Sequence, residues 1–334
     1  MLAFSIILQL TKLALISLPL SPDKRMTLPN EPEVVLLGLE DVPRLLALSR
    51  QVGWSHTERD WKAMVSTGTT FGHCHSKDDG CGGDDSLASC IHMTEFGTQF
   101  ATLGMLIVSK PHQKKGLATS LVNRLLAHNK PEKRSIGLIT ATPAQSFYPQ
   151  FGFQTTGEHI LKLTKAMGSP KNVAFGVDST NLKMTPVSSQ NDIKEVMQFD
   201  KNVAKLERSP LLEHLLKNTD RSFLAHNYTE KDASSLLGFG MAKLQGSLLN
   251  VGPIVSTDPT AALALCQSLT EDHEGPIRMD VYESQHDFVQ GALELLGFHE
   301  DDRQAVMMNT FGENDRHLPG NRIAMFCPAS QAWL

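Results

Sequence analysis

The order of expected elements repeats along this chain, and the repeat limits its possible folds more than any other feature. In each half, helices precede strands, followed by a helix, a strand, a helix, a Gly-Phe pair and a last strand. The two pairs, Gly152-Phe153 and Gly297-Phe298, lie 145 residues apart, a common length for a domain. Alternating strands and helices indicate a mixed sheet covered by helices. The sequence therefore predicts two diverged copies of one α/β fold.

Composition agrees with two globular domains. The chain has 334 residues, of which 41% are hydrophobic and 20% are charged, which is enough for two cores. A stretch rich in Gly, Pro, Ser and Asn lacks periodicity and separates the halves. We predict a first domain over 27–165, a linker over 166–182 and a second domain over 183–334. Residues 1–26 form an apolar N-terminal extension outside the fold argument, and Lys12 interrupts it, so no stable membrane span is expected.

Charge and cysteine content argue against several classes of function. The net charge of −5 disfavours a nucleic-acid partner, because such proteins usually carry a basic excess. The five cysteines are scattered and form no CxxC pair, so neither a disulfide framework nor a zinc site is predicted. Three of them lie near histidines between 73 and 92, but at irregular intervals. We expect free thiols, no metal, and a reducing, cytoplasmic location.

The expected elements follow from hydrophobic periodicity and turn residues. In the first half, strands are expected at 34–38, 69–75, 87–95, 101–108, 136–141 and 158–163, with helices after Asp41, between Trp54 and Trp61, from 117, and over 144–150. In the second half, helices are expected at 192–203, 210–216, 260–269 and 287–296, with strands at 222–225, 235–243, 247–255, 277–282 and 305–308.

The segment Leu103–Ala127 carries the clearest chemical signal. A buried strand ends at Val108, a basic loop follows, and Gly116 opens a helix. Backbone amides at a helix start are unpaired and favour anions, and a glycine lets the backbone approach a bulky phosphate. Lys114 and Lys115 add positive charge. By themselves, these residues fit an ordinary surface loop with solvated lysines equally well.

Two motifs make the signal specific. The pattern Gln113-x-x-Gly116-x-Ala118 resembles the acyl-CoA-binding motif of the GNAT acetyltransferase superfamily. The segment AQSFYPQFGF at 144–153 resembles the family's later motif A-x-x-F-Y-x-x-x-G-F. The likeness extends over 30–165 by motifs and over 183–334 by element order only. It implies a tandem GNAT N-acetyltransferase with a degenerate second domain, each domain being a mixed, mostly antiparallel sheet flanked by helices.

The resemblance also implies roles for individual residues. It implies direct transfer of an acetyl group from acetyl-CoA to an amine acceptor, either a small molecule or a peptide. Tyr148 matches the position of the acid that protonates the departing thiolate, and a phenol with a pKa of about 10 is protonated at neutral pH. The residues implied in binding acetyl-CoA are Leu106, Ile107, Val108, Gln113, Lys114, Lys115, Gly116, Leu117, Ala118 and Thr119. The alternative is a catalytically weak CoA-binding sensor or interaction protein.

The chain departs from the family pattern at two positions in the first half. Many members carry a glutamate where Gly104 stands, so the general base is unassigned. Glu95 and His92 on the preceding strand are the alternatives, and strand alternation lets only one of them face the cleft. An asparagine often found in the family is replaced by Ala141, which removes one side-chain contact to the cofactor.

The second half lacks the phosphate-binding loop. Its strand–helix junction carries Asp258 and has neither a lysine nor a Gly-rich turn, so a diphosphate would meet repulsion. We expect one acyl-CoA per chain, bound by the first half, with the second half on the acceptor side. On this interpretation, deleting 183–334 would impair acceptor use more than CoA binding.

Overall fold

The computed structural model describes residues 33–54, 56–74, 86–129, 134–167, 181–228, 235–310 and 324–329. The first half forms strands β1 (Val34–Leu37), β2 (Gly68–Cys74), β3 (Leu87–Phe96), β4 (Phe100–Val108), β5 (Ser135–Ala141) and β6 (Phe153–Lys165), with helices α1 (Val42–Gln51), α2 (Glu58–Thr67) and α3 (Leu117–Asn129). The second half forms strands β7 (Leu182–Pro186), β8 (Arg221–Asn227), β9 (Ser235–Gln245), β10 (Leu248–Ser256), β11 (Ile277–Tyr282), β12 (His299–Thr310) and β13 (Met325–Cys327), with helices α4 (Gln190–Ala204), α5 (Ser209–Asn218), α6 (Pro259–Thr270) and α7 (His286–Glu294).

Local signals account for several element boundaries. Helix α2 begins with a capping box in which Thr57 accepts from the Asp60 amide and the Asp60 carboxylate accepts from the Thr57 amide. Gly152 and Gly297 have φ of +87° and +71°, so each ends its helical segment in the left-handed region that favours glycine. The helix expected over 144–150 is two short 3-10 turns, since Pro149 has no N–H to continue a helix.

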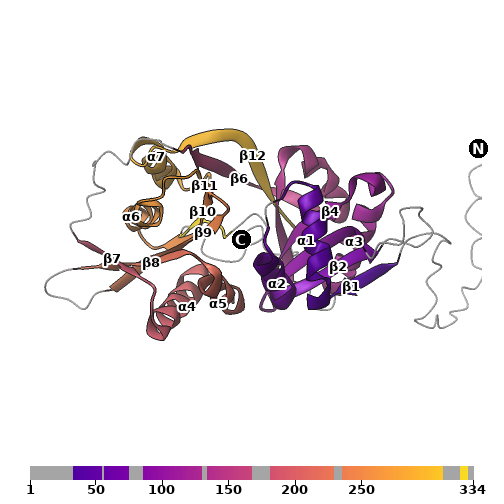
Figure 1. Ribbon diagram of the computed structural model, residues 1–334, viewed down its shortest axis with the longest axis horizontal. Coiled ribbons are helices and arrows are strands. Elements are labelled where there is room, and N and C mark those ends of the chain that lie inside the picture. Colours follow the sequence, from indigo (N-terminus) through magenta and orange to yellow (C-terminus); the bar gives the residue numbers. More distant parts are fainter. Residues whose placement is uncertain are drawn as a thin grey trace, which may run out of the picture. The chain divides into compact units, whose positions relative to one another are not determined.

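All described strands belong to one mixed sheet, which confirms the predicted α/β class. The order is β1-β2-β3-β4-β5-β12-β6-β11-β10-β9-β8-β7, and β13 pairs with β10. Strand β12 of the second half is inserted between β5 and β6, and β6 of the first half is inserted between β11 and β12. Figure 1 shows β6 and β12 side by side where the two halves meet. The sequence predicted a sheet for each half and did not reveal this exchange.

Helices cover both faces of the first half's sheet. Helices α1 and α2 pack with one set of buried residues, to which Cys90 and Phe96 of β3 contribute. Helix α3 packs with another set, which includes Ile91 and Met93 of the same strand. Successive strand residues point to opposite faces, so these contacts place the helices on opposite sides. Among the helices of the described residues, none combines the length and apolarity needed to cross a membrane.

The C-terminal strand β13 fills a gap in the second half. Strands β10 and β11 are paired in parallel only as far as Val251 and Met279. Beyond that point β10 pairs instead with β13, which also contacts β11. The segment lies so close that a Cβ on Gly252 would overlap the carbonyl oxygen of Pro328.

The strand exchange predicts that the first half does not fold alone. Removing 183–334 takes away β12 and leaves unpaired edges on β5 and β6. We expect segment 27–165 to lack a cooperative transition when urea unfolding is followed by circular dichroism. The control is the full chain cut once within 166–182, which keeps all strands and should keep the transition. A fragment that unfolds cooperatively, with the same urea midpoint as the full chain, would contradict this role of β12. Deleting 183–334 therefore removes strands that the first half needs, and it is not a clean test of acceptor use.

Candidate active site

Strands β4 and β5 separate at their C-terminal ends. Their parallel pairing runs from Phe100–Ser135 to Leu103–Leu138 and goes no further among the described residues. Two residues of β4, Met105 and Leu106, lie opposite Ile91 of β3, which forms a β-bulge. Met105 has a φ of +53° at this bulge. Beyond the bulge, no strand of the described residues covers the edge of β4 on the β5 side.

The loop after β4 is tied back to the strand end. The Ser109 hydroxyl lies 2.9 Å from His112 Nδ1, and Gln113 Nε2 donates to the Val108 carbonyl at 3.2 Å. Lys114 and Gly116 have φ of +62° and +84°, which turns the chain sharply into α3. The Gln113 side chain thus stabilises the loop by a hydrogen bond to the end of β4.

The start of α3 has the properties of an anion site. The first bond of the helix runs from the Ser120 amide to the Gly116 carbonyl at 3.0 Å, so the amides of Leu117, Ala118 and Thr119 precede it and lack intrahelical partners. A Cβ built on Gly116 would meet no atom within 4 Å, so the space before the helix is open. The side chains of Lys114 and Lys115 are exposed beside it. Such a helix start suits a bound anion, a diphosphate among them.

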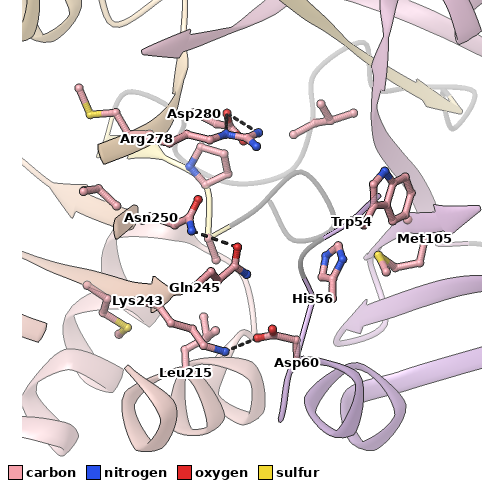
Figure 2. A pocket seen from close by; sticks show the side chains of 18 of the residues that line it. Trp54, His56, Asp60, Met105, Leu215, Lys243, Gln245, Asn250, Arg278 and Asp280 are labelled. Carbon is pink, nitrogen blue, oxygen red and sulfur yellow. Dashed lines mark hydrogen bonds and ion pairs between the residues drawn. The ribbon is translucent and has the colours of Figure 1, made fainter. Parts of the chain in front are cut away.

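A cavity of about 520 Å³ lies where the two halves meet. Its size suits a small-molecule ligand. Figure 2 shows its two walls: Trp54, His56, Asp60 and Met105 come from the first half, and Lys243, Asn250 and Arg278 face them from the second. Further lining residues are Leu103, Gly104, Leu106, Ile139, Thr140, Ala141, Ala144 and Tyr148 of the first half, and His214, Leu215, Asn218, Met279, Asp280 and Ala329 of the second.

The charged side chains of the cavity are paired. Lys243 of β9 donates to Asp60 of α2, so this ion pair joins the two halves. Burial opposes ionisation of Asp60, but hydrogen bonds from Lys243 and Thr57 outweigh it and hold the pKa of Asp60 below its ordinary value. On the opposite side, Arg278 Nη2 lies 2.9 Å from Asp280 Oδ2. The cavity therefore contains two ion pairs.

Tyr148 lies in the cavity wall among aromatic rings. Its ring stands edge-on to Phe147 and Phe153, with centroids 5.2 and 5.8 Å away. Burial raises the pKa of the Tyr148 phenol above its ordinary value, and a hydrogen bond with Thr140 partly opposes the shift. The hydroxyl is therefore protonated at neutral pH and is able to donate.

The two bases considered from sequence lie elsewhere. His92 is fully buried between the hydroxyls of Thr70 and Thr94, at 2.9 and 3.0 Å, and burial lowers its pKa to about 3. Glu95 pairs with Arg134 at 3.0 Å. Neither residue lines the cavity. Gly104 does line it, at the position where the resemblance would lead one to expect a glutamate, and contributes no carboxylate.

The structure brings together only some of the residues implied by the motifs. Leu106 and Tyr148 line the cavity, whereas Ile107, Val108 and the loop 113–119 are not among its lining residues. The side chain of Ile107 is buried in the hydrophobic core and therefore does not reach the cavity. Among the described residues, no group of three His, Cys, Asp or Glu side chains could hold a metal ion. Cys81 and His75 lie outside the described residues.

Sequence reasoning missed most of the cavity. The second-half wall, including Lys243 and Arg278, lies far from the motifs in sequence and carries no pattern of its own. His56 directly precedes the Thr57-x-x-Asp60 capping box. That box could have marked the start of a helix, but it could not have shown that the helix faces a second half.

Comparison with known proteins identifies both halves. Residues 81–162 and residues 196–320 each match a model described as an acetyltransferase (GNAT) domain. A Bacillus subtilis (strain 168) protein named as the uncharacterized N-acetyltransferase YitH is 26% identical over 276 residues, which is 82% of this chain and 90% of the relative.

Solved structures share the fold at low sequence identity. A Pyrococcus horikoshii protein provisionally assigned as an acetyltransferase is 14% identical with a TM-score of 0.67, covering 94% of this chain and 100% of that one. A tandem GNAT protein from the clavulanic acid biosynthesis pathway is also 14% identical with a TM-score of 0.62, covering 85% of this chain and 100% of that one. The two successive matches to acetyltransferase (GNAT) domains, over 81–162 and 196–320, show that this chain belongs to the GNAT superfamily, and its fold is that of a tandem GNAT protein.

Proposed function

We propose that the first half transfers an acetyl group from acetyl-CoA to the nitrogen of an amine bound in the cavity between the halves. One observation carries the proposal: the gap between β4 and β5 opens into this cavity. Gly104, Met105 and Leu106 of β4 line it together with Ile139–Ala141 of β5 and with Tyr148. A donor held along the gap and an acceptor held in the cavity would thus meet beside a phenol that can give a proton.

The chain's own groups suit the two ends of the donor. The amides of the first turn of α3, with Lys114 and Lys115, would hold the diphosphate, and the free edge of β4 beyond Leu103 would align the pantetheine. Bound acetyl-CoA would supply an activated thioester carbonyl. The Tyr148 hydroxyl would donate its proton to the departing sulfur, a contribution typical of general acids. The apolar side of the wall would exclude water from this point.

The direct test is release of CoA from acetyl-CoA in the presence of a broad panel of amines, with mass spectrometry of the products. Amine-dependent CoA release with a product heavier by one acetyl group would support the proposal. Tight binding of acetyl-CoA without turnover of any amine would favour the alternative, a CoA-binding sensor or interaction protein.

Gly116→Asp should weaken acetyl-CoA binding at least about ten-fold, or about 1.4 kcal/mol, because it adds a carboxylate before the helix start. The matched control is Gly157→Asp on β6. Both glycines have positive φ, +84° and +81°, and open space for a Cβ, so both variants carry similar backbone strain of about 1–2 kcal/mol. Calorimetry on folded protein should show a loss of affinity for the first variant only. Equal affinities would refute the phosphate-binding role of the loop.

Tyr148→Phe should lower kcat by on the order of 10²-fold with little change in acetyl-CoA affinity, because it removes a proton donor. The control is Tyr228→Phe, which changes a tyrosine that is 53% exposed and lies outside the cavity. Steady-state kinetics with the best amine of the panel would separate the two. Turnover of Tyr148→Phe at the control's rate would show that another group or solvent supplies the proton.

Titration with acetyl-CoA should give one site per chain. In the second half, β13 occupies the gap between β10 and β11, and the Asp258 carboxylate accepts from the Ala261 amide at 2.8 Å, which caps α6. The place that an anion would take is therefore filled by a side chain of like charge. Calorimetry would measure the stoichiometry, and a value of two would contradict this account of the second half.

A further inference from the structure

His56 is a cavity residue to which the mechanism above gives no role. It lies directly before the capping residue Thr57 of α2, and Figure 2 shows its imidazole beside the cavity, near Trp54 and Met105. Its ring centroid lies 5.7 Å from that of Trp54 and 6.4 Å from that of Trp61. The contact with Trp61 joins the residue before the cap to the fourth residue of the helix, which fixes the direction of chain entry.

The packing around His56 is itself well anchored. Trp61 is fully buried, and its indole Nε1 donates to the Ser49 hydroxyl of α1 at 3.2 Å. The imidazole is therefore held by a rigid aromatic neighbour. Met105 of the β4 bulge belongs to the same cavity wall, so His56 shares that wall with the backbone beside which the thioester would lie.

The surroundings of His56 keep its imidazole neutral at pH 7. Its Nδ1 atom is buried and has no hydrogen-bond partner among the described residues. Burial lowers the pKa of His56 below its ordinary value of 6.5; Asp60 of α2 opposes the shift, while Lys243 of β9 and Arg278 of β11 reinforce it. Asp280 of β11 and His214 of α5 line the same cavity.

Other candidate bases of the cavity are engaged. His214 Nε2 lies 3.0 Å from the Asn218 amide nitrogen. The carboxylates of Asp60 and Asp280 are each in an ion pair, with Lys243 and Arg278 respectively. The imidazole of His56 lines the cavity and makes no hydrogen bond or ion pair among the described residues, so it is the cavity group best prepared to accept a proton.

Resting on the proposed function, we infer that His56 is the general base that takes the proton from the acceptor amine. A neutral amine forms the C–N bond while the C–S bond breaks and its electron pair stays on sulfur. As the bond forms, the nitrogen loses one proton to the imidazole of His56, and the sulfur gains one from the Tyr148 hydroxyl. Exchange with water returns a proton to Tyr148 and removes one from His56, so the products are the amide and CoA. His56 would thus take the place of the glutamate that the resemblance implies at the position of Gly104.

The test compares His56→Gln with His226→Gln in the full chain. His226 pairs with Glu195 on the second half and lies outside the cavity, so it controls for loss of a half-buried histidine. With the best amine of the panel, His56→Gln should lower kcat about 10²-fold or more, while acetyl-CoA affinity by calorimetry stays within about two-fold of wild type. His226→Gln should match wild type in both.

The pH dependence separates a base from a positioning residue. The ratio of wild-type to His56→Gln rates cancels the ionisation of the amine itself. It should be large at pH 7–8 and fall toward one as the pH drops below the lowered pKa of His56, because the protonated imidazole accepts no proton. Added imidazole should restore part of the rate of His56→Ala and leave that of His226→Ala unchanged.

The possible results distinguish this inference from the proposed function. A wild type that turns over amines while His56→Gln keeps the control's rate would overturn the base assignment alone. So would a slow His56→Gln with a pH-independent ratio and no rescue by imidazole, or a loss seen with His214→Gln but not with His56→Gln. A wild type that binds acetyl-CoA and acetylates no amine would overturn the proposed function, and the base assignment with it.

Discussion

The antiparallel pairing of β6 with β12 is the interaction on which the rest of this structure depends. Each strand leaves its own half in sequence and closes the sheet of the other. Because of this exchange, neither half has a complete sheet of its own. A half taken alone would have an unpaired strand edge, whose exposed backbone groups must find other partners. The exchange also fixes the position of one half against the other, so that Lys243 of β9 reaches Asp60 of α2. The cavity forms between the halves because they are held in this position.

One fold has produced two different clefts in this chain. In each half, two parallel strands separate at their C-terminal ends. In the first half, the gap opens into the cavity and is followed by a loop with exposed lysines and a helix start whose first amides lack intrahelical partners. In the second half, β13 fills the gap and Asp258 caps the helix. The same backbone geometry thus leaves the helix start open, as the proposed anion site requires, or closes it, depending on whether a side chain or a chain segment already satisfies the free groups.

The electrostatics of the cavity favour chemistry between neutral groups. Its ion pairs join Asp60 with Lys243 and Arg278 with Asp280, so its charges are matched within the protein. Burial raises the pKa of Tyr148 and lowers that of His56, which keeps the phenol protonated and the imidazole uncharged at neutral pH. A neutral amine enters such an environment with a smaller desolvation cost than an ammonium ion. In the proposed mechanism, these are the protonation states that the proton donor and the proton acceptor require.

Some features of this protein follow from local sequence patterns, whereas others depend on which strands pair in the folded chain. The sequence by itself determined most helices and strands, both Gly-Phe turns, the loop before α3 and the family, because these depend on periodicity, on left-handed glycines and on short motifs. It did not reveal the three-residue strand β13, which is too short to show alternation. Only the tertiary structure decided that β6 and β12 exchange, that neither Glu95 nor His92 lines the cavity, and that His56 meets Lys243 and Arg278 across it. The reason is physical: a strand's pattern records which face is buried, whereas the partner at its edge is selected by backbone hydrogen bonds that every sequence can offer.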